Sequence, residues 1–532
     1  MDTFDYIVIG AGPAGCAVAS RLADGVGAPR VALIEAGKPK PSLLSAVPVG
    51  VVALAPRKNA YNYALETVPQ TELGGRRGYV PRGRGVGGSS LINAMIYTRG
   101  QPRDYDDWAV AGCTGWAWSD VLPLFKRSEC NSRGEDAWHG AAGPLAVSDL
   151  ASPSPMALAF VEAAAQCGFS RNDDFNGAGQ EGVGLYQVFQ RGGRRLDAGT
   201  AYIANGPPRP NLAVLADTKV LRIVIDGRKA TGVTILGPGG LRTITARREV
   251  IVSAGAIMSP QLLMLSGIGP AEMLSQHGIP VIVDAAEVGE NLQDHIDYTA
   301  NARMNAPGLI GFTPAALLRE AVSMVPFIRR RTGLLTSNIA EAGGFVRSSP
   351  EAARPDLQFH FCIGIVDDHA RRIHAATGIA LHVCVLRPES RGRVTLASRD
   401  EEAAPLIDPR FLSAPGDMEL LMRGARIVHK ILRASALARY RGRLLYGTGQ
   451  ANDEGLRALI RDHADTIYHP VGTCRMGGDE RSVVDPQLRV RGIEALRVAD
   501  ASIMPTLVSG NTQAPSAMIG EKAVDLIMEQ WS

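Results

Sequence analysis

Two short apolar runs in the first part of the sequence flank a stretch with helical periodicity. Residues 6–9 are bulky and partly β-branched, which predicts a buried strand, and residues 31–34 form a second such run. Residues 16–22 are good helix formers with apolar positions at helical spacing. The order strand, helix, strand predicts a βαβ unit built on parallel strands.

The apolar pattern predicts further elements along the chain. Residues 211–252 are rich in strand signals, with a hairpin whose arms, 219–225 and 230–235, flank the turn pair Asp226-Gly227. A last strand-to-helix unit extends over residues 496–528.

Two other regions of the chain differ in their pattern of apolar and polar residues. Residues 37–80 hold scattered prolines and glycines without a sustained period, which predicts a long, mostly irregular connection. Residues 379–386 and 392–398 alternate between apolar and polar positions, which predicts strands.

A glycine motif joins the first predicted strand to the first helix. Residues 10–15 read GAGPAG, the G-x-G-x-x-G spacing of dinucleotide-binding proteins. Gly10 permits the tight turn, Gly12 lets a pyrophosphate approach the backbone, and Gly15 lets helix and strand pack closely. Pro13 is tolerated because its missing N–H would be unpaired at a helix start.

Glu35 follows the second strand, 20 positions after Gly15, where an acid binds a ribose hydroxyl. An acid at this position disfavours a 2′-phosphate, so the motif predicts a dinucleotide other than NADP. The alternative is an ordinary βαβ unit with a glycine turn, and the register of strand, helix, strand and acid argues against it.

Composition narrows the class of protein. The chain has 532 residues, 45% hydrophobic and 20% charged, and its net charge of +3 gives no sign of a nucleic-acid partner. Seven cysteines without a C-x-x-C pair favour reduced thiols. The first strand leaves no room for a signal peptide and no apolar stretch is long enough to span a bilayer, so we expect a cytoplasmic protein.

Residues 315–331 combine apolar positions with the run Arg329-Arg330-Arg331. A basic amphipathic helix of this kind can lie on a membrane surface. The alternative, which we favour here, is a helix packed on the protein with a solvated basic end.

Residues 82–93 read RGRGVGGSSLIN, and their amides can form an anion-binding nest beside two arginines, or simply a flexible turn. This stretch resembles a signature of the glucose–methanol–choline (GMC) oxidoreductase family, whose members use FAD to oxidise alcohols. Further blocks match the family in its own order: 99–108, 253–260, 266–270, 288–295, 468–473, 500–502 and 511–513. Within the family the chain looks most like bacterial dehydrogenases of sorbose, polyethylene glycols and choline, with Tyr186-Gln187 and residues 355–360 fitting the sorbose type.

The resemblance implies an α/β fold with a Rossmann-like FAD-binding domain and an inserted α+β substrate domain on an antiparallel sheet. The FAD-binding domain is expected to be discontinuous, and the substrate domain likewise. The expected segments are 1–155, 190–298 and 462–532 for FAD, and 156–189 and 299–461 for substrate.

Oxidising an alcohol requires a base for the hydroxyl proton and an acceptor for the hydride. The family pattern implies His469 as this base and Asn511 as its partner, which donates to the substrate oxygen. The implied partners are a small-molecule alcohol and a quinone or other electron acceptor.

The resemblance also implies the cofactor contacts. Gly10, Gly12 and Glu35 would hold the diphosphate and ribose, and Val220 the adenine. Residues along the flavin and its linker would include Gln513, which replaces the family's commoner Asn. The full implied set is Gly10, Gly12, Pro13, Ala14, Gly15, Glu35, Ala36, Arg84, Val86, Asn93, Met95, Val220, Ala254, Asp500, Ala501, Thr512 and Gln513.

Two residues and one cluster carry further expectations. Ile92 stands where some choline-oxidising relatives attach FAD through a histidine, so we expect non-covalent FAD. Glu341 is either a substrate contact or a buried carboxylate paired with an arginine. The cluster of residues 367–369 with His374 matches no metal spacing, and we expect a solvated loop and no metal.

Three other functions remain open at this stage. The chain could be an oxygen-using alcohol oxidase, or a hydroxynitrile-lyase-type enzyme with a non-redox FAD. A non-catalytic nucleotide-binding module would require His469 and Asn511 to be incidental.

Overall fold

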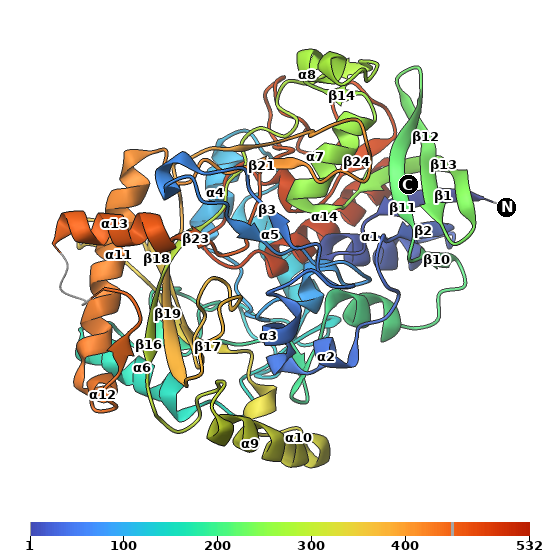
Figure 1. The fold of residues 1–532 in the computed structure, drawn as a ribbon. Helices are drawn as coiled ribbons and strands as arrows, with labels where there is room; N and C mark the ends of the chain where they lie inside the picture. The colour runs from blue at the N-terminus through green and yellow to red at the C-terminus, as the bar shows by residue number, and fades with distance from the viewer. Residues whose placement is uncertain (1, 448–451, 532) are drawn as a thin grey trace.

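The computed structural model describes residues 2–447 and 452–531, and its strands form two seven-stranded sheets with several short ribbons beside them (Figure 1). The first sheet has the order β10-β2-β1-β13-β12-β11, and β24 pairs with the end of β13. Its strands are β1 (Thr3–Ile9), β2 (Val31–Ile34), β10 (Leu212–Leu215), β11 (Lys219–Asp226), β12 (Lys229–Gly237), β13 (Gly240–Val252) and β24 (Leu496–Val498).

The predicted βαβ unit forms the centre of the first sheet. Strands β10, β2, β1, β13 and β24 run parallel to their neighbours, and β11 and β12 add an antiparallel edge. Helix α1 (Pro13–Ala23) has Pro13 in its first turn and packs against the C-terminal helix α14 (Gln513–Trp531). In the predicted hairpin, Asp226 pairs with Lys229, so the turn residues are Gly227 and Arg228 and lie one position later than expected.

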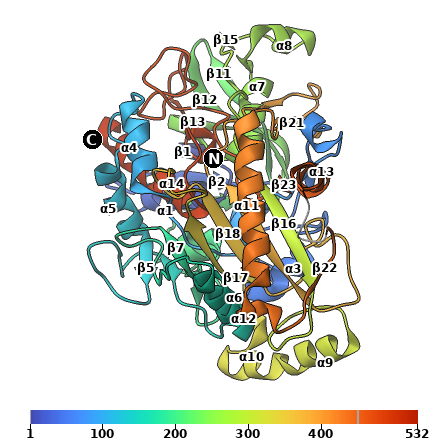
Figure 2. The ribbon, with the colours of Figure 1, turned by 90° about the vertical axis from the view of Figure 1, so that its left-hand side faces the viewer.

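The second sheet is antiparallel throughout and lies apart from the first, with the order β22-β16-β19-β18-β17-β7 and β23 beside β16. Helix α11 (Pro415–Arg433) crosses one face of it (Figure 2). Its strands are β7 (Gly182–Leu185), β16 (Ile296–Arg303), β17 (Ala340–Val346), β18 (Leu357–Cys362), β19 (Gly378–Val385), β22 (Arg443–Leu444) and β23 (Asp465–Thr466). The expected domain boundaries at 299 and 461 therefore fall inside β16 and before β23, and the domain division itself stays a prediction.

The two stretches predicted from alternation have different surroundings. All eight residues of β19 are buried, because Leu381 and Val383 pack in one apolar cluster with α11 while Ala380 faces a second cluster. Strand β20 (Arg393–Thr395) pairs with β21 (Leu406–Asp408) in a separate ribbon against α7 (Gly255–Leu265). It does not join the second sheet.

The connection over residues 37–80 is mostly irregular, as predicted, but contains short elements that the pattern missed. These are α2 (Leu43–Ala46), α3 (Val51–Leu54), β3 (Leu65–Glu66), β4 (Tyr79–Val80) and two 3₁₀ turns, Pro48–Gly50 and Thr71–Leu73. The other described α-helices are α4 (Pro102–Val110), α5 (Trp118–Ser128), α6 (Pro155–Gln166), α8 (Ala271–Gln276), α12 (Ser435–Ala438) and α13 (Asp453–His463). Three further two-stranded ribbons join β5 (Glu129–Asn131) to β6 (Leu145–Val147), β8 (Gln190–Arg191) to β9 (Arg194–Arg195) and β14 (Ile268–Gly269) to β15 (Val283–Asp284).

The predicted basic helix at 315–331 is two helices, α9 (Pro314–Val322) and α10 (Met324–Arg330). Phe327 is buried, but Leu317, Leu318, Val322 and Val325 are 49–67% exposed, so the favoured interpretation of a packed helix was wrong for most of its apolar residues. Across the described residues, no helix has both the length and the apolar character needed to cross a membrane.

Candidate active site

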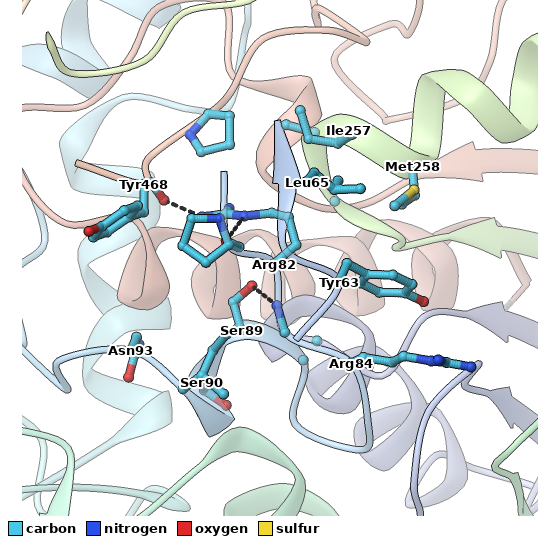
Figure 3. A pocket seen from close by; sticks show the side chains of 18 of the residues that line it. Tyr63, Leu65, Arg82, Arg84, Ser89, Ser90, Asn93, Ile257, Met258 and Tyr468 are labelled. Carbon is cyan, nitrogen blue, oxygen red and sulfur yellow. Dashed lines mark hydrogen bonds between the residues drawn. The ribbon is translucent and has the colours of Figure 1, made fainter. Parts of the chain in front are cut away.

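A cavity of about 600 Å³ lies between the two sheets and receives residues from both. Its walls include the ends of β1 and β2, the amino end of α7, and residues of β18 and β19. Figure 3 shows part of the wall, where the guanidinium of Arg82 donates to the carbonyl of Tyr468 over 2.7 Å. All of the predicted cofactor residues line this cavity except Gly15 and Val86, and so do His469 and Asn511.

The three motif glycines differ in what surrounds them. A Cβ at Gly15 would lie 1.9 Å from the carbonyl oxygen of Gly10, and a Cβ at Gly10 would lie 2.5 Å from that of Ser253. Both positions are therefore closed by protein backbone. A Cβ at Gly12 would meet no protein atom within 4 Å, although Gly12 lines the cavity. The open space at Gly12 is the part of the motif that a ligand can use.

Glu35 organises the loops around this end of the cavity. Its carboxylate accepts hydrogen bonds from the backbone N–H groups of Ala11 (3.1 Å), Gly37 (2.8 Å) and Gly85 (3.0 Å). Burial raises the pKa of Glu35, against the lowering effect of these N–H donors. Because the Gly85 amide binds Glu35 and the Gly87 amide binds the carbonyl of Ala11, the expected anion nest at residues 82–93 is not free.

Several polar side chains of the cavity wall have unused hydrogen-bonding capacity. Arg84 Nε and Gln513 Nε2 are buried donors that find no partner among the residues the structure describes, and both residues line the cavity. The Asn93 amide donates to Gln513 Oε1 and its oxygen accepts from Met95 N–H over 3.1 Å, so these residues hold one another. Buried donors facing open space fit a cofactor that carries carbonyl and phosphate oxygens.

Asp500 ties together two loops that meet at the cavity. Its carboxylate accepts from the N–H of Gly255 (2.8 Å), the hydroxyl of Ser259 (2.6 Å) and the N–H of Ser502 (2.7 Å). These bonds cap the start of α7 and of the following 3₁₀ turn, residues 501–503. The expected contact of Asp500 with the cofactor stays a prediction.

His469 and Asn511 come together at the opposite end of the cavity. Asn511 Nδ2 lies 3.1 Å from His469 Nε2, and Asn511 Oδ1 accepts from Gln358 Nε2 over 3.0 Å, which fixes the orientation of the amide. The backbone N–H of His469 donates to Asp294 over 2.8 Å. Burial lowers the pKa of His469 well below its usual value, with His295 and His360 acting in the same direction.

A second histidine sets the tautomer of His469. His295 Nε2 lies 3.0 Å from the carbonyl oxygen of Leu386, and His295 Nδ1 lies 3.0 Å from His469 Nδ1. A carbonyl only accepts, so His295 carries its proton on Nε2 and presents a lone pair at Nδ1. His469 must then donate from Nδ1, which leaves its Nε2 unprotonated beside Asn511.

The histidine end of the cavity also contains a charged pair that sequence reasoning missed. His382 Nδ1 lies 2.7 Å from Asp297 Oδ2 across strands β19 and β16. Burial alone would lower the pKa of His382, but the Asp297 carboxylate raises it to about 10. Nearby His360 also lines the cavity, and burial lowers its pKa to about 3.

Two expectations about acidic residues need correction. Glu341 does not line the cavity. Its carboxylate accepts from Ser154 N–H over 2.6 Å, and no arginine within residues 2–447 and 452–531 pairs with it. The cause is strand alternation, since the preceding residue Ala340 lines the cavity instead.

The loop over residues 367–374 is not simply solvated. His369 lines the cavity wall and lies 2.9 Å from Asp465 and 2.6 Å from the Tyr468 hydroxyl, while His374 lies 2.7 Å from Asp367. No cluster able to hold a metal ion is found among the described residues.

Comparison with known proteins places this arrangement in a family. Models described as GMC oxidoreductase match residues 4–297 and 388–520. The chain belongs to the GMC oxidoreductase family. An alcohol dehydrogenase [acceptor] from Pseudomonas putida is 45% identical over 99% of this chain and 96% of its own.

Other family members are similar over nearly the whole length. An oxygen-dependent choline dehydrogenase from Rhizobium johnstonii is 40% identical over 98% of this chain and 95% of its own. The crystal structure of pyridoxine 4-oxidase from Mesorbium loti superposes with a TM-score of 0.87 at 31% identity, covering 98% of each chain. The expected family, fold, FAD cofactor and enzyme class, an oxidoreductase acting on alcohols, are confirmed.

Proposed function

We propose that the protein is a dehydrogenase that oxidises the CH–OH group of a small alcohol or polyol to the aldehyde or ketone. The unprotonated Nε2 of His469, 3.1 Å from the amide nitrogen of Asn511, is the observation that carries the proposal. A hydroxyl at the third corner of this pair can donate its proton to Nε2 and accept a hydrogen bond from the amide.

Two residues of the chain have distinct roles in the proposed oxidation. His469 Nε2 takes the hydroxyl proton, and Asn511 Nδ2 stabilises the negative charge that develops on the oxygen. FAD, when bound, supplies the acceptor for the hydride that leaves the carbon. The alcohol thereby loses one proton and one hydride, and the proton on His469 is later released.

Charge at the site favours this role. The low pKa of His469 keeps the imidazole neutral at neutral pH, so the base is ready without prior deprotonation. Neutral His295 holds Nδ1 of His469 and prevents the tautomer that would place a proton on Nε2.

The cofactor, acceptor and compartment complete the proposal. We propose Rossmann-type binding of FAD at Gly12 and Glu35, held without a covalent bond because Ile92 offers no nucleophile, and a substrate domain built on the second sheet. The acceptor we propose is a quinone or a similar compound; the printed name of the alcohol dehydrogenase [acceptor] relative supports a separate electron acceptor without saying which. Seven free cysteines support a reducing compartment such as the cytoplasm.

Anaerobic flavin reduction tests the proposal. A panel of alcohols is mixed with the purified flavoprotein under nitrogen, and loss of the oxidised-flavin spectrum is timed for wild type and His469→Gln. We expect the rate to fall about 10²- to 10⁴-fold in the variant because the general base is gone. His277, a partly buried histidine directly after α8, provides the matched control, and His277→Gln should keep the wild-type rate.

Three results would contradict the proposal in different ways. If no alcohol bleaches a fully flavin-loaded protein, the redox role fails and a lyase with structural FAD is supported. If admitted air reoxidises the flavin rapidly, the enzyme is an oxidase. Flavin that stays with acid-precipitated protein would overturn non-covalent binding.

A further inference from the structure

Helices α9 and α10 expose an unusual concentration of apolar side chains. Between residues 312 and 328, seven large apolar residues are about half exposed or more, including Leu318 (67%), Ile328 (63%) and Val322 (62%). The others are Phe312, Leu317, Met324 and Val325. In these two helices only Ala316 and Phe327 are buried. An apolar patch of this kind on a folded protein marks a contact surface.

The patch continues onto a second segment of the chain. Leu43 is 88% exposed and Leu44 50%, both in α2, and Val52 of α3 is 39% exposed. The turn at residues 48–50 contacts the turn at residues 334–336 just after α10, so the two segments adjoin. Figure 1 shows α9 and α10 at the lower edge of the molecule, with α2 and α3 above them. We refer to residues 37–60 and 306–337 together as the apolar end.

Positive charge is concentrated at the apolar end. It contains eight basic residues and one acidic residue, Glu320, whereas the whole chain has a net charge of only +3. The carboxylate of Glu320 accepts from Gly311 N–H, and Lys38 pairs with Asp217. Lys40, Arg57, Lys58, Arg329 and Arg330 are exposed and form no ion pair with any described residue.

We propose that the apolar end docks on an anionic lipid surface. Apolar side chains that enter the bilayer boundary, together with basic residues that meet anionic headgroups, are the two contributions that hold an interfacial helix. A second copy of the chain fits less well, because a two-fold contact would place this excess of positive charge against itself.

When the apolar end lies on the membrane, the part of the cavity wall formed by α3 lies close to the lipid surface. Val51 and Val52 of α3 line the cavity, and Val52 also belongs to the exposed patch. A lipophilic alcohol or acceptor can therefore pass from the bilayer into the cavity beside α3 without crossing water. This consequence rests on the proposed function, whereas the docking itself does not.

Vesicle flotation tests the docking with the flavin-loaded protein. The vesicles are pure phosphatidylcholine or equimolar phosphatidylcholine and phosphatidylglycerol. We expect binding to the anionic vesicles only, weakened by salt. Leu318→Ser/Val322→Ser/Ile328→Ser should weaken binding about 100-fold, and Arg329→Gln/Arg330→Gln about 10- to 30-fold.

The controls change the same residue types elsewhere on the surface. Val26→Ser/Val110→Ser/Leu158→Ser and Arg242→Gln/Arg399→Gln change exposed residues that lie outside the apolar end, and these variants should bind like wild type. The proposal is overturned if the control variants lose vesicle binding to the same extent, or if the wild-type protein does not bind anionic vesicles. So does a lipid-free dimer that the apolar triple variant converts to monomer, because the patch would then be a subunit interface.

Turnover separates the docking from the chemistry. With a water-soluble dye as acceptor, the apolar triple variant should match wild type. With a long-chain quinone dissolved in the anionic vesicles, its rate should fall at least tenfold. Failure with both acceptors in wild type refutes the proposed function and leaves the flotation result standing, while equal rates with the quinone refute access from the membrane.

Discussion

The two ends of the cavity are built in different ways. At the glycine end, Gly10, Gly12, Gly15 and Glu35 lie within 26 residues and act mainly through backbone groups and close packing. At the histidine end, His295, Asp297, His382 and His469 come from distant segments and act through side chains. The first end is specified by local sequence, and the second exists only after the second sheet has formed.

The histidine end also shows that a partner, more than burial, decides the charge of a histidine. His382 lies in β19 and His295 lies directly before β16, and both side chains are buried. His295 faces a carbonyl and another histidine, and burial lowers its pKa to about 3. His382 faces Asp297, which raises its pKa to about 10 against the effect of burial. The cavity wall thus combines a neutral base with a histidine that is paired with a carboxylate.

The largest effect is expected from breaking the charged pair with Asp297→Asn. Loss of one partner of a buried ion pair should lower the free energy of unfolding by about 3 to 5 kcal/mol at pH 7. Because the folded pKa of His382 is raised, this stabilisation is complete below the unfolded value of 6.5 and is lost as pH rises through about 10. Denaturant unfolding at pH 6.5 and pH 9 should show the gap between wild type and variant shrinking.

The control for this comparison is an exposed pair. Asp525 binds Arg127 with its carboxylate 45% exposed, so Asp525→Asn should cost less than about 1 kcal/mol. A gap between wild type and Asp297→Asn that is unchanged over this pH range would show that His382 is not the titrating partner.

Strand register explains why sequence reasoning missed this pair. Thr299 lies directly opposite His382, and Asp297 is the diagonal neighbour on the same face. The two residues are 85 positions apart, and no local motif predicts that β16 pairs with β19. The alternation of apolar and polar residues in β19 also did not predict that His382 is buried, because both faces of this strand are buried. The blocks around His295 and His360 were recognised by resemblance, but no role followed from the residues alone.

The glycine end offers a sharper contrast between packing and ligand binding. Gly15→Ala places a Cβ 1.9 Å from a backbone oxygen and should destabilise the fold by about 3 kcal/mol. Gly12→Ala meets no protein atom, so the stability of the FAD-free protein should change by less than about 0.5 kcal/mol. We expect its FAD affinity to fall at least tenfold, measured by flavin fluorescence titration. Equal FAD affinity for Gly12→Ala and wild type would place the diphosphate elsewhere.

This end could be predicted because its mechanism is local. The glycine spacing, the helix start at Pro13 and Glu35 follow one another in sequence, and the structure brings them together as expected, with Gly15 serving packing rather than the cavity wall. The short helices α2 and α3 could not be predicted, because each has only four residues and too little periodicity to detect. The place of α3 in the cavity wall follows from tertiary contacts.

The smallest effect concerns the histidine that positions the base. His295→Leu removes the acceptor of the His469 Nδ1 proton, so the imidazole can adopt the tautomer with Nε2 protonated. We expect flavin reduction by alcohol to slow about tenfold, a barrier increase of about 1.4 kcal/mol, with FAD content unchanged. His295→Asn keeps an acceptor oxygen in reach and should restore most of the rate. If His295→Leu and His295→Asn slow the reaction equally, His295 contributes its size rather than a hydrogen bond. Packing would then position residues at the histidine end of the cavity, as it does at the glycine end.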